Sequence, residues 1–247
     1  MIRIITRQPS GISFMTSFDV KKELKALAKP DKAKVLAGFF KTGSGQYGAG
    51  DKFLGITVPE QRQIARKYSQ LPLGDVAMLL ASHWHEERLT AALILVEKFQ
   101  SGEEKDKREI FQFYLAHSKG INNWDLVDLT ADKIVGAWLS QKGQLLLLDK
   151  LARSANLWER RIAVIATFAF IKQGDFGPTF KLAEKLLDDP HDLIHKAVGW
   201  MLREAGKRDE AALRKFLDAH VGQMPRTMLR YAIEKLPLSL RQQYLKK

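Results

Sequence analysis

The chain has 247 residues and no cysteine, which excludes disulfide bonds, a thiolate nucleophile and a cysteine-ligated metal centre. Its 45% hydrophobic and 28% charged residues are typical of a soluble globular protein, and no apolar stretch reaches the length of a transmembrane helix. The net charge is +12, and the excess lies at the two ends, because residues 51–200 carry equal numbers of acidic and basic residues. Such an excess favours a polyanionic partner.

The first 18 residues have neither the apolar core of a signal peptide nor a helical pattern. We expect a disordered N-terminal extension over residues 1–18 and a folded domain over residues 19–247. A second methionine, Met15, stands just before the first helical pattern, so translation from an upstream start codon would explain the extension.

The rest of the chain predicts helices, because apolar residues recur at helical spacing and the alternation typical of strands is scarce. Apolar stripes of this kind lie within residues 35–40, 89–96, 162–169 and 197–201. Predicted helices can be aligned at Arg88, Trp124, Arg160 and Lys196, which are 36 residues apart, and a further helix starts at Arg230. Each step has room for a helical hairpin, so we predict an all-α, HEAT-like helical-repeat solenoid with a concave groove.

Two local patterns suggest a dinucleotide site and a metal site, but the residues around them do not fit either site. Gly43, Gly45 and Gly48 have the spacing of a dinucleotide-binding loop, yet they follow a helical pattern and not a strand, so we expect a mobile loop or a structural turn. The histidines at 83 and 85 and at 191 and 195 lack a third convergent ligand. We therefore predict surface or interface histidines and no metal.

Four side chains with complementary chemistry fall on one face of the aligned helices. Trp124, Asp128, Arg161 and Trp200 occupy offsets 0, 4, 1 and 4, which span about 100° of a helix. Indoles stack on sugars and bases, a guanidinium binds phosphate, and a carboxylate stabilises a sugar cation. This set suits cleavage of a deoxyribose–base bond. Alternatively, the tryptophans belong to the core, Asp128 pairs with Lys133, and Arg161 faces solvent.

Four segments resemble the signature stretches of the AlkD family of DNA alkylation repair glycosylases: residues 41–59, 122–128, 157–161 and 196–204. The resemblance runs in order from about residue 19 to the C-terminal region. It implies that Asp128 is the catalytic carboxylate, that Trp124 and Trp200 flank the deoxyribose of the lesion, and that Arg161 contacts phosphate. One departure is Asn123, where members of the family can have a second tryptophan.

The resemblance implies a monofunctional DNA glycosylase that acts in base excision repair without a cofactor. Its partner would be double-stranded DNA carrying cationic alkylated purines such as 7-methylguanine and 3-methyladenine. We expect Arg161, Lys41, Lys196 and Arg203 to bind this DNA, and we expect a monomer, not bound to membranes, in the bacterial cytoplasm and on the nucleoid. Two alternatives stay open, a non-catalytic protein that binds bent or branched DNA and a protein-binding scaffold.

Overall fold

Helices make up nearly all the regular structure of the protein. The computed structural model describes residues 15–246, and within this range there is no strand and only one isolated bridge, between Lys52 and Trp84. The all-α prediction is confirmed. The helices are α1 (Ser17–Ala26), α2 (Pro30–Phe39), α3 (Val58–Lys67), α4 (Leu73–Leu80), α5 (His85–Ser101), α6 (Glu104–Ala116), η1 (Ser118–Gly120), α7 (Trp124–Ala131), η2 (Asp132–Gly136), α8 (Ala137–Lys142), α9 (Leu146–Ala152), α10 (Leu157–Lys172), α11 (Gly177–Lys185), α12 (Asp192–Gly206), α13 (Glu210–His220), α14 (Arg226–Ala232) and α15 (Leu238–Lys246).

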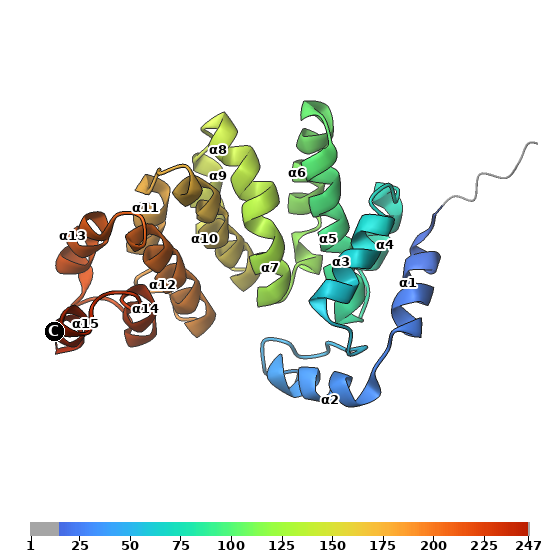
Figure 1. Cartoon of the computed structure of the whole chain (residues 1–247), viewed down its shortest axis with the longest axis horizontal. Helices are drawn as coiled ribbons and strands as arrows, with labels where there is room; N and C mark the ends of the chain where they lie inside the picture. Colours follow the sequence, from blue (N-terminus) through green and yellow to red (C-terminus); the bar gives the residue numbers. More distant parts are fainter. Residues whose placement is uncertain (1–14, 247) are drawn as a thin grey trace, which may run out of the picture.

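Most helices are arranged as hairpins that stack side by side, as Figure 1 shows from right to left. The second helices of the hairpins form one continuous row, in which α5 packs on α7, α7 on α10, α10 on α12 and α12 on α14. These second helices begin at residues 85, 124, 157, 192 and 226. The helical repeat is therefore confirmed, but its constant step of 36 residues is wrong, because loops of unequal length space the hairpins 33 to 39 residues apart.

Two glycines allow neighbouring helices of the row to approach closely. A Cβ atom on Gly136 would lie 2.2 Å from the carbonyl oxygen of Ala166, and one on Gly199 would lie 2.5 Å from that of Met228. Both distances are far inside van der Waals contact. Glycine at these positions therefore sets how tightly η2 packs on α10 and α12 on α14.

Helix α1 begins at Ser17, two residues before the predicted domain boundary. Thr16 forms a capping box with Asp19, since its hydroxyl accepts from the Asp19 amide and the Asp19 carboxylate accepts from the Thr16 amide. The amide of Ser17 also donates to Asp75 Oδ1 at 2.7 Å, which ties α1 to α4. Residues 1–14, to which the rest of the predicted extension belongs, lie outside the described residues.

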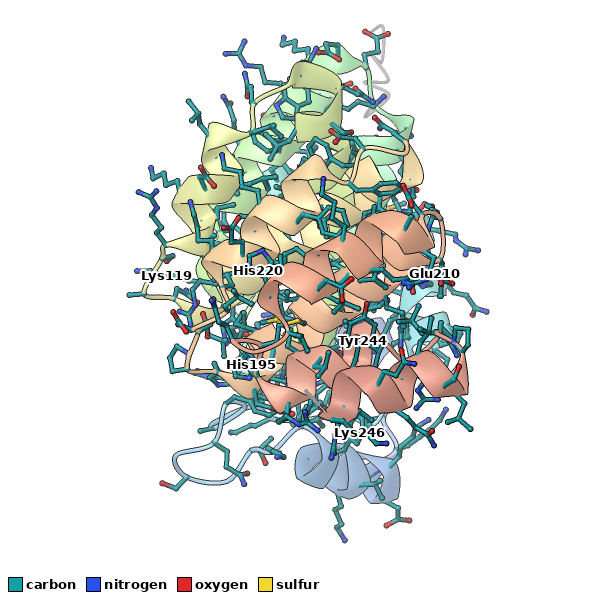
Figure 2. All side chains as sticks on the ribbon, turned by 90° about the vertical axis from the view of Figure 1, so that its left-hand side faces the viewer. Lys119, His195, Glu210, His220, Tyr244 and Lys246 are labelled. Atoms are coloured by element: carbon teal, nitrogen blue, oxygen red, sulfur yellow. The ribbon has the colours of Figure 1, made fainter. Side chains whose placement is uncertain are left out.

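Helix α2 and the loop after it form an arm that stands apart from the stack. Both views place α2 below the row of hairpins (Figure 1, Figure 2), and none of its own residues is buried. Val35 and Phe39 are 70% and 61% exposed, so the apolar stripe predicted there is not a core stripe; of its residues only Phe40 is buried. We call residues 30–57 the α2 arm. Within the described range, no helix has the length and apolar character of a membrane span.

Candidate active site

A cleft of about 460 Å³ lies between the α2 arm and the row of second helices. Helices α7, α10, α12 and α14 each contribute side chains to it, and the arm supplies the opposite wall. All seven residues predicted for catalysis or nucleic-acid binding line this one cleft: Lys41, Trp124, Asp128, Arg161, Lys196, Trp200 and Arg203. Residues from four hairpins thus converge, as the repeat predicts.

The centre of the cleft is an ion pair between Asp128 and Arg161. Arg161 Nε donates to Asp128 Oδ1 at 2.9 Å, and Arg161 Nη2 donates to Asp128 Oδ2 at 2.8 Å. Arg161 Nη1 donates to the carbonyl oxygen of Leu193. Arg161 is buried, so it does not face solvent. Asp128 does not pair with Lys133 either, because that ammonium binds the Leu129 carbonyl and Asp132.

Two opposing effects act on the Asp128 carboxyl group. Burial raises its pKa above the ordinary aspartate value, and the neighbouring acids Asp125 and Asp132 act in the same direction. The charge and the two hydrogen bonds of Arg161 act against this rise. A guanidinium bound side-on through two nitrogens also fixes the orientation of the carboxylate. The result is a carboxylate that is poorly hydrated and rigidly held.

The two tryptophans of the cleft are half-buried and contact other aromatic rings. Trp124 stacks on Phe40, with ring centroids 5.0 Å apart and planes at 18°, and it meets the edge of Phe39 at 5.8 Å. Trp200 leans on Phe168 at 6.3 Å, and its Nε1 donates to Glu204 Oε1 at 3.3 Å. Neither indole is enclosed in the core, so each has a surface that faces the cleft.

Behind Trp124 lies a buried charged cluster that the sequence analysis missed. His85, predicted to be a surface or interface histidine, is 2% exposed. Its Nδ1 lies 3.1 Å from Asp51 Oδ2 and its Nε2 lies 2.8 Å from Asp125 Oδ2. Arg88 Nη2 also donates to Asp51, at 2.7 Å. We call Asp51, His85, Arg88 and Asp125 the His85 cluster.

The His85 cluster joins the α2 arm to the start of α7. Burial alone would lower the pKa of His85, but the Asp125 charge and the hydrogen bonds to Asp125 and Asp51 raise it to about 9. The imidazole is therefore charged at neutral pH and bridges two carboxylates.

Asn123, which stands where members of the family can have a second tryptophan, is buried, and its Oδ1 accepts from the amide of Trp124 at 2.8 Å. Asn123 thereby caps the N-terminus of α7, the helix that carries Trp124 and Asp128.

The three predicted basic contacts at the rim differ in their pairing. Lys41 is exposed, has a positive φ of 53°, and takes part in no ion pair with any other described residue. Lys196 pairs with Asp192 at 2.8 Å, and Arg203 pairs with Glu234 and with Glu204. Lys41 is thus the rim cation most available to an anion, whereas the other two must share their charge.

Other residues of the cleft were not predicted. Phe39 and Tyr47 belong to the arm, and Tyr47 meets the edge of Trp158 at 6.2 Å, so the glycine-rich loop reaches across to α10. Leu193 and Tyr231 come from the repeat helices. Tyr231 follows the aligned position Arg230 by one residue, just as Arg161 follows Arg160. The repeat alignment could therefore have predicted Tyr231 as a residue of the cleft.

Metal ligation finds no support in the part of the chain that the structure describes. No three histidine or acidic side chains there are placed to hold an ion. His191 caps α12, because its Nδ1 accepts from the Leu193 amide, and His195 Nε2 lies against the Asp189 carbonyl. Both histidines are accounted for by local structure.

Comparisons with known proteins agree with this fold. The DNA alkylation repair enzyme family matches residues 20–236. A solved structure described as a predicted DNA alkylation repair enzyme from Enterococcus faecalis has a TM-score of 0.65 at 17% identity, over 85% of this chain and 97% of that one. The structure of smu.31 from Streptococcus mutans UA159 has a TM-score of 0.52 at 15% identity, over 90% and 98%. No curated protein matches significantly. Because the family match covers most of its length, the chain belongs to the family of DNA alkylation repair enzymes.

Proposed function

We propose that the protein is a monofunctional DNA glycosylase that removes cationic alkylated purines, such as 7-methylguanine and 3-methyladenine, from double-stranded DNA. The observation that carries the proposal is the Asp128 carboxylate, held through both oxygens by Arg161 in a cleft that also presents Trp124 and Trp200. The family supports a role in the repair of alkylated DNA. The cleft supports the finer assignment of the bond that is broken.

The chemistry follows from the charge on the lesion. A purine alkylated at N7 or N3 carries a positive charge, so it leaves with the electron pair of the glycosidic bond and becomes neutral without prior protonation. Positive charge then develops on the deoxyribose. Asp128 would stabilise that charge and orient the water whose oxygen attacks C1′, while a proton of that water passes to the carboxylate or to solvent. The indole faces would stabilise the sugar cation further.

Arg161 has two tasks in this proposal. It orients Asp128, and it is the predicted phosphate contact. A guanidinium has five N–H groups. Three of them are used by Asp128 and Leu193, which leaves two to which a DNA phosphate could bind. Lys41, Lys196 and Arg203 line the same cleft and would hold the strand on either side of the lesion.

An assay of base release tests the proposal. The protein is incubated with a duplex that contains one 7-methylguanine, and the free base is separated and quantified. A matched duplex with guanine at the same position is the control. We expect release from the alkylated duplex alone. Binding of the duplex without any release would instead indicate a protein that binds DNA and does not cleave the glycosidic bond.

A further inference from the structure

A second cavity, of about 740 Å³, lies between α1, the α2 arm and the start of α5. It is separated from the cleft by a stack of three rings. Phe40 stacks on Phe53 at 5.1 Å and on Trp124 at 5.0 Å. Phe53 lines the second cavity, and Trp124 lines the cleft. We call this cavity the α1–α2 pocket.

One oxygen of the buried Glu87 carboxylate, which lines this pocket, accepts no hydrogen bond from any described residue. Glu87 is 7% exposed, and this oxygen is Oε2. The nearest cation is Lys21, whose Nζ is 3.7 Å away. The preceding residue shows the contrast, since Glu86 is also buried but accepts from the amides of Leu54, Gly55 and Ile56. A buried carboxylate oxygen that accepts no hydrogen bond is costly, so Glu87 Oε2 favours a ligand that supplies N–H groups.

The walls of the pocket are suited to a flat ring. Phe18 and Trp84 line it and are 72% and 37% exposed, and neither contacts another aromatic ring among the described residues. Phe53 adds a third aromatic surface. Exposed aromatic faces are the usual platforms on which unpaired bases stack.

The rim of the pocket is basic. Lys21, Lys22 and Lys25 line it from one helix, α1. Lys21 is occupied by Glu87, whereas Lys22 and Lys25 form no ion pair with any described residue. These lysines favour a ligand whose negative charge lies at the rim of the pocket.

We propose that the α1–α2 pocket binds an unpaired guanine nucleotide of a DNA strand. The base would stack against Trp84 and Phe18, and its N1–H and N2–H groups would donate to Glu87. The flanking phosphates would lie on Lys22 and Lys25. Guanine presents two adjacent donors only on its Watson–Crick edge, and cytosine covers that edge in a duplex. The nucleotide must therefore be unpaired.

The proposal takes DNA as the partner from the proposed function but concerns a separate site, so the two can fail independently. The test uses labelled eight-nucleotide strands of thymidine, with or without one central guanine, and measures affinity by fluorescence anisotropy. None of these strands carries a lesion. We expect the parent protein to bind the guanine strand about tenfold or more tightly than the thymidine strand, as two charge-assisted hydrogen bonds would provide.

Variants assign the preference to the pocket. Glu87→Gln keeps the shape of the side chain and should abolish most of the guanine preference while the thymidine strand binds as before. Trp84→Ala should weaken both strands roughly tenfold. Glu210→Gln is the matched control, because Glu210 is exposed and lies on α13 at the other end of the stack (Figure 2).

Two outcomes would overturn the proposal. The parent could bind the two strands equally, or Glu87→Gln could retain the full guanine preference.

Discussion

Asp128 differs from Glu86, Asp51 and Asp125 in what surrounds it. Glu86 is satisfied by backbone amides, and Asp51 and Asp125 share the two cations of their cluster, Arg88 and His85. Asp128 has one ionic partner, Arg161, and borders an open cleft. Removal of that partner would leave a buried charge uncompensated, which typically costs about 3–5 kcal/mol. Arg161→Ala therefore reports on folding as well as on DNA contacts, and it cannot isolate a phosphate contact.

His85 makes the stability of the protein depend on pH. Its pKa is about 9 in the folded protein, above the ordinary value of about 6.5 for an unfolded chain. The folded state therefore binds one more proton between these values, and this stabilisation is complete below about pH 6.5 and is lost as the pH rises through about 9. We expect the free energy of unfolding to fall by up to about 3 kcal/mol over that range.

Urea unfolding of the parent and of His85→Gln at about pH 6.5 and about pH 9.5 checks this expectation. Glutamine keeps hydrogen-bonding groups but cannot take up the proton. The variant should be less stable than the parent at the lower pH, and the difference should shrink at the higher pH. If the two proteins lose stability in parallel, the proton is not on His85.

For the helices, the residues that converge could be predicted from the sequence more accurately than the positions at which the helices begin. Arg161 is the fifth residue of α10 and Trp200 the ninth of α12, whereas the alignment placed them second and fifth. These errors of three to four residues are about one helical turn, so each side chain stays on the same face. The convergence on the cleft was therefore predicted correctly although the helix starts were not.

The parts of the site that the sequence did not reveal depend on contacts between distant residues. Asp51 and Asp125 lie 34 and 40 residues from His85, and no local spacing marks such a cluster. The stripe that contains Phe39 shows an amphipathic helix but not what covers its apolar face. In the folded protein the Phe39 side chain lines the cleft, so part of this apolar stripe belongs to the site.

Close packing within the row of helices predicts an asymmetry between two glycines. In Gly199→Ala the new methyl group would meet the Met228 carbonyl and the Tyr231 side chain, both at 2.5 Å, so α12 and α14 must move apart. We expect a loss of roughly 1–3 kcal/mol in the free energy of unfolding. A methyl group on Gly74, in α4, would meet no atom within 4 Å, so Gly74→Ala should be neutral or slightly stabilising. Equal losses in urea unfolding would contradict this account.

For the whole molecule, the excess positive charge lies in the first 50 and last 47 residues, with a neutral middle. The fold brings one cation from each of these two parts to the cleft, Lys41 from the α2 arm and Arg203 from α12. A strand bound there would meet cations from both ends of the chain. Its affinity should fall steeply with salt, because each phosphate contact releases counterions.

The salt dependence of duplex binding tests this arrangement. Lys41→Ala and Lys196→Ala should each weaken binding and lower the slope of log affinity against log salt by about one unit. Lys181→Ala is the matched control, since Lys181 is an exposed lysine on α11 that does not line the cleft. Unchanged slopes in both cleft variants would place the DNA elsewhere.

The most direct test of the proposed chemistry is single-turnover release of 7-methylguanine by Asp128→Asn. This change preserves the size of the side chain and removes the charge that would stabilise the sugar cation. Loss of one well-placed electrostatic group typically costs about 10²–10³ in rate. We expect excision to slow by that factor while duplex affinity, titrated at the same salt, is unchanged or higher, because repulsion from nearby phosphates is removed. Excision at the parental rate would show that Asp128 is not the catalytic carboxylate.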